Sequence, residues 1–244
     1  QKKIMIFKRK RPQKEIFNSF GWWDKGCFLG QMTGDRCDYI AACITKVFGK
    51  GALAQQDILE IGCGGGLICE ELAQRQAIIV GIDPSQGALE TARLHIQKSG
   101  LGHNVYYQQG IAEALPYANG SFSVIVCLDT LEHVQDLPAT IKEIARVLAP
   151  GGVFVFDTIN RTLLARVVLI WYGEHFPSGG LTPGLHNYHS FIKPTELQTL
   201  LTTSGLQVRE LTGFMPRGFR NGRAKMGPGW FTGLSYVGYV TKQR

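Results

Sequence analysis

The sequence lacks any uninterrupted stretch of about 20 apolar residues, which is the length that a helix needs to cross a bilayer. It also lacks a CxxC pair, because its six cysteines stand at irregular spacing and several fall in apolar stretches that predict buried elements. Internal repeats and low-complexity tracts are missing as well. These absences argue against a membrane-spanning chain and indicate reduced thiols in a cytosolic compartment.

Charge is present but unevenly placed. The net charge is +7, and the first fifteen positions carry seven basic residues against a single acidic residue, Glu15. Six more basic residues follow Glu210 with no acidic residue among them, so the middle of the chain is negative. Basic ends of this kind suit a nucleic acid or an anionic membrane surface, and they are equally compatible with solvated tails that have no partner.

The residues from Ile58 to Gly66 predict a buried strand that runs into a glycine turn. Gly62, Gly64 and Gly66 let the backbone turn sharply and approach a ligand closely, since no side chain stands in the way. A dinucleotide fingerprint would need another glycine where Leu67 stands, so NAD and FAD are disfavoured. The spacing favours a nucleoside cofactor that has no pyrophosphate.

A second β-branched run, residues 77–82, ends at Asp83. This position falls about 20 residues after the glycine turn, where an acidic side chain accepts hydrogen bonds from both hydroxyls of a ribose. Alternatively, Asp83 caps a helix that begins at Pro84.

Two more apolar runs, at 123–128 and 153–157, alternate with helical segments. This alternation predicts an α/β fold with a doubly wound parallel sheet that binds ligands at the carboxyl ends of its strands. With 244 residues, 44% of them hydrophobic, the chain can bury the core of one such domain but is short for two.

Residues 160–192 are far longer than a tight α/β connection requires. Their first part, from Arg161 to Tyr172, is apolar almost all round, so it should cover the active site, pack as core or lie in a membrane interface. His175, His186 and His189 of the same insertion could approach a substrate, although loop histidines are more often surface residues.

Several short motifs are spread along the chain: Trp22-Trp23-Asp24, the glycine turn, Leu131-Glu132-His133-Val134, Thr158-x-Asn160-Arg161, Phe191-Ile-Lys-Pro194 and Gly227-Pro-Gly229. On these motifs the chain resembles the ubiquinone-biosynthesis O-methyltransferases, which belong to the class I S-adenosylmethionine (SAM) methyltransferases, from about Phe17 onward. The glycine turn is generic to many methyltransferases, whereas the other motifs together are more specific.

The resemblance implies SAM-dependent methyl transfer to an oxygen of a hydrophobic phenol or quinol, with a polyprenylated ring as in ubiquinone biosynthesis as the favoured substrate. It implies a Rossmann-like, mostly parallel, seven-stranded sheet with an apolar helical insertion after the fifth strand. We therefore expect a basic extension at 1–16 and a methyltransferase domain at 17–244 that contains the insertion 160–192.

The resemblance also implies the cofactor contacts. Arg36, Gly62, Asp83 and Leu128 match positions that contact SAM in the family. Ile111 and Ala112 match the segment that lines the adenine, and because Ile111 stands where the family has Asp, we expect a main-chain contact there. Glu60, at the end of the first strand, is expected to orient the amino group of the cofactor through the loop.

Catalysis requires that a proton leave a phenolic oxygen whose pKa is about 10. Asp129, Glu132 and His133 follow the strand at 123–128 and would share one face of a helical turn. They could hold Mg²⁺ or Zn²⁺, as eukaryotic members of the resembling family do, or His133 could act as general base. Alternatively, Asp129 caps the helix and the other two residues only make structural hydrogen bonds.

Departures from the family leave the substrate open, since Asp129 stands where the family often has Glu. Another prenylated or hydrophobic phenol, or a natural-product catechol, would fit equally well. A nucleic-acid or protein N-methyltransferase is disfavoured, because positions 129–132 do not read Asn/Asp-Pro-Pro-aromatic. A lipid-binding protein that retains the fold without catalysis is a further alternative.

We expect peripheral contact with an anionic membrane and no specific nucleic-acid partner. The first residue is not Met, so the native start is missing and a targeting segment could have preceded it. The expected location is the cytoplasm, at the inner surface of the membrane, or the matrix side of an organelle if such a segment was removed.

Overall fold

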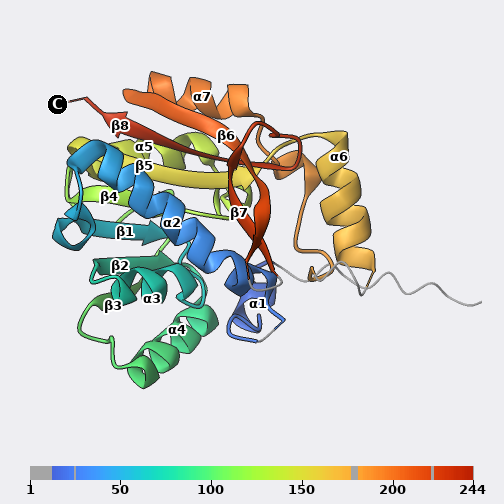
Figure 1. Ribbon diagram of the computed structural model, residues 1–244, viewed down its shortest axis with the longest axis horizontal. Helices are drawn as coiled ribbons and strands as arrows, with labels where there is room; N and C mark the ends of the chain where they lie inside the picture. The colour runs from blue at the N-terminus through green and yellow to red at the C-terminus, as the bar shows by residue number, and fades with distance from the viewer. Residues whose placement is uncertain (1–12, 25, 177–180, 221–222, 244) are drawn as a thin grey trace, which may run out of the picture.

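The computed structural model describes residues 13–24, 26–176, 181–220 and 223–243 (Figure 1). Most of the predicted basic extension, residues 1–12, lies outside the described residues, as do residues 177–180 of the predicted insertion. Within the described ranges, no helix is long and apolar enough to cross a membrane.

One eight-stranded sheet forms the centre of the molecule, in the order β3-β2-β1-β4-β5-β8-β6-β7. The strands are β1 Asp57–Ile61, β2 Ile78–Asp83, β3 Val105–Gln109, β4 Phe122–Cys127, β5 Leu148–Ile159, β6 Leu206–Arg220, β7 Arg223–Gly229 and β8 Ser235–Lys242. The first five strands pair in parallel, which confirms the predicted doubly wound sheet, whereas β8, β6 and β7 pair antiparallel.

The predicted count of seven strands is wrong by one. The additional strand is β7, which forms a hairpin with the second half of the long strand β6, from Gly213 to Arg220. Its sequence is rich in glycine and basic residues rather than in β-branched ones, so no apolar alternation indicated a strand there.

Apolar residues on successive positions of the central strands point to opposite faces of the sheet. Ile58, Val124 and Val153 belong to a core on the side of α2 (Phe28–Phe48), α3 (Leu67–Gln74) and α4 (Gln86–Ser99). Leu59, Ile125 and Phe154 belong to the core on the side of α5 (Leu137–Val147) and α7 (Pro194–Thr203). Burial on both faces explains why these strands form continuous apolar runs.

The insertion begins after β5 as α6 (Leu163–Ala165), which continues directly into a π-helix over Arg166–Gly173. Thr162 caps its start, with its hydroxyl oxygen accepting from the amide of Ala165 at 3.0 Å. Figure 1 shows this helix to one side of the sheet, beyond the end of β5. The predicted helical insertion after the fifth strand is therefore present.

Candidate active site

A large cavity opens at the carboxyl ends of the parallel strands. Its volume is about 1880 Å³, larger than the roughly 300–1,000 Å³ of a typical small-molecule pocket. Its wall combines the glycine turn after β1, the end of β2, the turn after β4, the segment around α1 (Gln13–Asn18), the insertion and the β6–β7 hairpin. The space is sufficient for a nucleoside cofactor and a second molecule together.

Asp83 lies at the end of β2 and its carboxylate holds the glycine turn in place. One oxygen accepts from the amide of Gly64 at 2.9 Å and the other accepts from the amide of Ser85 at 2.7 Å. The cap of α4 is Ser85, whose hydroxyl accepts from Ala88 at 3.1 Å, so Asp83 is not the helix cap. A carboxylate oxygen can accept a second hydrogen bond, and Asp83 therefore keeps acceptor capacity on the cavity wall.

Seven of the nine predicted cofactor residues line the cavity: Arg36, Glu60, Gly62, Asp83, Ile111, Ala112 and Leu128. Gly64 and Gly66 are packed against protein instead. A Cβ on Gly64 would clash with the ring of Trp22, and a Cβ on Gly66 would clash with the hydroxyl of Tyr107. Both glycines also have positive φ, 49° and 84°, so their backbone conformation and packing require glycine without any contact to a ligand.

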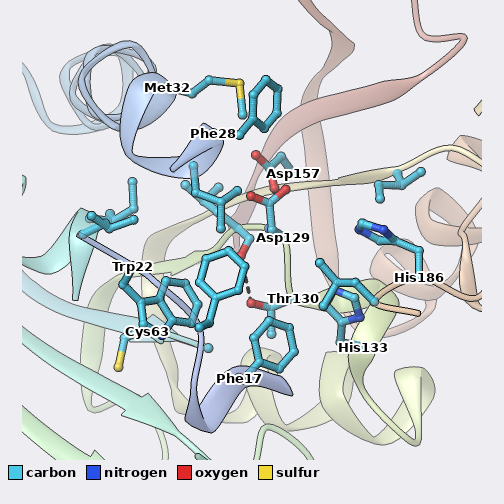
Figure 2. Close-up of a pocket in the computed structure, with 18 of the residues that line it drawn as sticks. Phe17, Trp22, Phe28, Met32, Cys63, Asp129, Thr130, His133, Asp157 and His186 are labelled. Atoms are coloured by element: carbon cyan, nitrogen blue, oxygen red, sulfur yellow. Dashed lines mark hydrogen bonds between the residues drawn. The ribbon is translucent and has the colours of Figure 1, made fainter. Parts of the chain in front are cut away.

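The N-terminal segment covers the glycine turn. The indole N–H of Trp23 donates to the carbonyl of Gly65 at 2.9 Å, and Trp22 is buried against Gly64 and Gly65. Phe17 stacks on Trp22 with ring centroids 6.0 Å apart and contacts the edge of His133 at 5.5 Å. One short segment therefore contacts both the glycine turn and the turn after β4, as Figure 2 shows.

Glu60 is buried at the end of β1 and accepts from the thiol of Cys69 at 2.8 Å. The pKa of Glu60 is raised to about 8, mainly by burial and also by the nearby charge of Asp83, against the lowering effect of the Cys69 hydrogen bond. The neutral acid is therefore favoured near neutral pH, which gives Glu60 a proton that it can donate.

Arg36, from the middle of α2, forms a buried ion cluster with two carboxylates. Its guanidinium lies 2.6 Å from Asp129 and 3.1 Å from Asp157. Burial alone would lower the pKa of Arg36, but the two carboxylates outweigh it and raise that pKa, so Arg36 stays charged. The remaining oxygen of Asp157 accepts from the amide of Asp129 at 2.6 Å and ties the turn to β5.

The structure does not place Asp129, Glu132 and His133 on one helix face, as the predicted metal site assumes. Asp129 has a positive φ of 47° and precedes the 3-10 turn Leu131–His133, so the three side chains do not share a helix face. Among the residues that the structure describes, no three His, Cys, Asp or Glu side chains form a group that could hold a metal ion. Asp129 pairs with Arg36 at 2.6 Å.

Glu132 is buried and accepts from the hydroxyl of Thr158 at 2.8 Å. Burial raises its pKa, and the charges of Asp129 and Asp157 add to this effect, so the protonated form is favoured.

His133 faces the cavity beside His186 of the insertion, with ring centroids 5.8 Å apart (Figure 2). The pKa of His133 is lowered to about 4, mainly by burial and also by the neighbouring His186, while Asp129 acts in the opposite direction. His133 is therefore a neutral ring at any pH near 7. Of the other insertion histidines, His175 and His189 are exposed.

His186 is held by a contact with Glu174 that the sequence did not indicate. Nδ1 of His186 lies 2.9 Å from the carboxylate of Glu174, which is buried. A histidine twelve positions after a glutamate has no characteristic spacing, so only the fold brings the two side chains together.

The apolar helix of the insertion has two sides. Leu169 and Ile170 pack with Ile159 and Phe191 in a small core. The opposite side is exposed and consists of large apolar residues, which are Leu163, Leu164, Val167, Trp171, Tyr172 and Phe176. The prediction of a simple core element is therefore met by only part of this helix.

Known proteins resemble the chain in sequence and in fold. A family model described as a methyltransferase domain matches residues 59–156. The ubiquinone biosynthesis O-methyltransferase of Saccharophagus degradans is 37% identical over 196 residues, covering 79% of each chain. The protein of the same name from Parvibaculum lavamentivorans is 38% identical over 200 residues, covering 79% of this chain and 78% of the relative.

Solved structures extend the similarity of fold to almost the whole chain. A SAM-dependent methyltransferase from Thermotoga maritima, described as a possible histamine N-methyltransferase, matches with a TM-score of 0.63 and 20% identity, covering 95% of this chain and 100% of its own. Magnesium protoporphyrin IX methyltransferase from Synechocystis, with bound S-adenosylhomocysteine, has a TM-score of 0.64 and 20% identity, covering 94% and 98%.

Proposed function

The chain belongs to the ubiquinone biosynthesis O-methyltransferase family, and on this basis we propose that it transfers the methyl group of SAM to a hydroxyl oxygen of a hydrophobic phenol or quinol. The finer proposal is a polyprenylated ring, as in ubiquinone biosynthesis. The observation that carries it is the large cavity, whose wall includes both the glycine turn and many apolar side chains.

Bound SAM supplies a methyl group on a positively charged sulfur, which a phenolic oxygen displaces in line. The protein must hold the two molecules in register and remove the phenolic proton, whose pKa is near 10 in water. A closed apolar cavity assists by excluding water from the reacting atoms.

We propose that the carboxylate of Asp83 accepts hydrogen bonds from the ribose hydroxyls, using the acceptor capacity that the amides of Gly64 and Ser85 leave. Main-chain groups at Ile111 and Ala112 would line the adenine. The remaining proposed contacts come from Arg36, Glu60, Gly62 and Leu128, with Gly64 and Gly66 shaping the turn.

The substrate would occupy the apolar end of the cavity. Its walls there come from the insertion and the β6–β7 hairpin, with the side chains of Leu169, Leu181, Leu185, Phe214, Met215 and Met226. We propose that the polyprenyl tail leaves the site between these two elements, because both line the cavity with apolar side chains.

The turn after β4 would form the catalytic wall of the site. We propose that Asp129 and Glu132 hold this wall in shape through their bonds to Arg36 and Thr158, and that His133 faces the ring of the substrate. The proposed catalytic domain spans residues 17–244 and includes the insertion 160–192, with a basic extension at 1–16.

We also propose that the enzyme docks on an anionic membrane. A polyprenyl substrate is almost insoluble in water, and the exposed face of the insertion presents Leu163, which is 71% exposed, and Trp171, which is 59% exposed. Phe219 of the β6–β7 hairpin is 84% exposed, and that hairpin lines the same cavity. Apolar side chains beside arginines suit the interfacial region of a bilayer.

The test is to incubate the protein with SAM that carries a labelled methyl group and a lipid extract, and to identify the labelled product by mass. We expect one methyl ether on a prenylated phenolic ring. A label on a non-prenylated catechol would favour the natural-product alternative, and a label found only in added RNA or protein would contradict O-methylation of a phenol.

A further inference from the structure

Glu174 stands directly after the π-helix of the insertion and is buried, with only 4% of its surface exposed. Its carboxylate accepts three hydrogen bonds from one short loop. The amide of Gly184 donates at 2.6 Å, the amide of His186 at 2.7 Å, and Nδ1 of His186 lies at 2.9 Å. A buried carboxylate thus fixes both the backbone and the ring of His186.

The contacts determine which ring nitrogen of His186 carries hydrogen. Burial alone would raise the pKa of Glu174, but the hydrogen bonds from the His186 ring and from the two amides outweigh it and lower that pKa. The carboxylate is therefore ionised and can only accept hydrogen bonds. Nδ1 of His186 must be the donor, so Nε2 of the neutral ring carries a lone pair.

This ring lies on the substrate side of the cavity. His186 lines the cavity beside His133, and Phe191 contacts its ring at a centroid distance of 6.1 Å. Figure 2 shows the two histidines together on the wall opposite Trp22. A general base must lie within hydrogen-bond reach of the proton that it removes, and the His186 ring is held on the cavity wall where a phenol would bind.

We infer that His186 is the general base of the methyl transfer and that Glu174 is its positioning residue, an inference that rests on the proposed O-methylation of a phenol. The phenolic O–H bond breaks as its proton passes to Nε2 of His186. The oxygen forms a bond to the methyl carbon while the carbon–sulfur bond breaks, and that electron pair goes to sulfur. The products are the methyl ether, S-adenosylhomocysteine and a protonated His186, which returns its proton to solvent.

The charged groups around His186 favour this assignment over His133. Glu174 carries a negative charge that stabilises the imidazolium, and the facing ring of His133 stays neutral, with a pKa of about 4. The charge of Asp129 raises the pKa of His133 but does not outweigh the burial that lowers it.

The experiment compares His186→Ala, His186→Asn and Glu174→Gln with the parent enzyme on a soluble prenylated phenol. His186→Ala should lower kcat by about 10²-fold to 10⁴-fold, as expected for loss of a general base, and added imidazole should restore part of it. Glu174→Gln should lower kcat by roughly 10-fold to 100-fold with little change in KM. The reason is that a neutral amide lacks the charge with which Glu174 orients the His186 ring and stabilises its protonated form.

A second measurement follows the ionisation of the phenol without turnover. The absorbance of a phenol bound in the complex with S-adenosylhomocysteine should show phenolate character in the parent and less in His186→Asn. His189→Asn is the matched control, because His189 belongs to the same insertion and is exposed, and it should behave as the parent does.

The outcomes separate the inference from the proposed function. A parent enzyme that methylates no phenol would refute the proposed function itself. If the parent is active and the folded His186→Asn variant keeps more than about a tenth of the parent kcat, the inference is wrong and the function stands. Imidazole rescue of His133→Ala, but not of His186→Ala, would likewise assign the base to His133.

Discussion

Asp83→Ala should weaken the binding of S-adenosylhomocysteine by about 1.5–3 kcal/mol, which is the range for hydrogen bonds to a charged group. This corresponds to about a 10-fold to 150-fold increase in Kd. The carboxylate lies on the cavity wall at the end of β2, and each of its oxygens accepts one amide while retaining room for a ribose hydroxyl. Isothermal titration calorimetry measures the change directly.

The same substitution also removes the acceptors of two loop amides, those of Gly64 and Ser85. Each unpaired buried donor costs about 1–3 kcal/mol of stability unless water replaces its partner. The free energy of unfolding should therefore fall together with the affinity. Asp83→Asn keeps one carbonyl acceptor and the shape of the side chain, so it should lose less stability while still losing the charge.

Asp136→Ala is the matched control for Asp83→Ala. Asp136 is the cap of α5 and accepts from the amide of Ala139 at 2.9 Å, but it does not line the cavity. Its loss should cost about 1 kcal/mol of stability and leave the affinity unchanged. A folded Asp83→Ala variant that binds as tightly as the parent would refute the ribose contact, and equal weakening in both variants would attribute the effect to stability.

Three further predictions follow from other parts of the structure. Burial raises the folded pKa of Glu60 to about 8, above its usual value of about 4.3. The folded state therefore binds the Glu60 proton more tightly than the unfolded state does, and the resulting stability is complete below the unfolded pKa and is lost as pH rises through about 8. Urea titrations should therefore show the unfolding free energy falling from about pH 5 to about pH 8, and falling less steeply in Glu60→Gln. An equal dependence on pH in the parent and in Glu60→Gln would contradict the raised pKa of Glu60. Cosedimentation with anionic vesicles should weaken as salt shortens the Debye length from about 10 Å at 0.1 M toward 3 Å at 1 M. It should weaken further in Leu164→Glu or Trp171→Glu but not in Leu94→Glu, whose site is 60% exposed on α4; equal binding by all variants would make the exposed face of the insertion irrelevant to docking. Turnover should persist in EDTA, because the carboxylates of the predicted metal site are bonded to other side chains, and a loss that Mg²⁺ or Zn²⁺ reverses would show otherwise.

The glycine turn and the parallel strands could be predicted because their signals are local. The apolar runs, the three alternating glycines and the acidic residue at Asp83 each lie within one strand–turn unit. The strand β7 could not be predicted in the same way, since it is stabilised by pairing with β6 and not by its own apolar pattern.

The turn after β4 was predicted less well for a physical reason. Positions 129, 132 and 133 share a face only if a regular helix begins at Asp129, and the structure places that residue in the left-handed region instead. The carboxylate of Asp129 pairs at 2.6 Å with Arg36, which is distant in sequence. Such tertiary ion pairs leave no periodic trace in the sequence.

The segment from Phe17 to Trp23 has a consequence for the kinetics of the enzyme. It closes over the glycine turn through Trp22 and Trp23, and it contacts the turn after β4 through Phe17. A ligand at either end of the cavity therefore meets the same piece of chain. Binding of the methyl donor would fix this segment before the phenolic substrate binds. Steady-state kinetics should therefore fit a compulsory order, with the methyl donor binding first and its demethylated product leaving last.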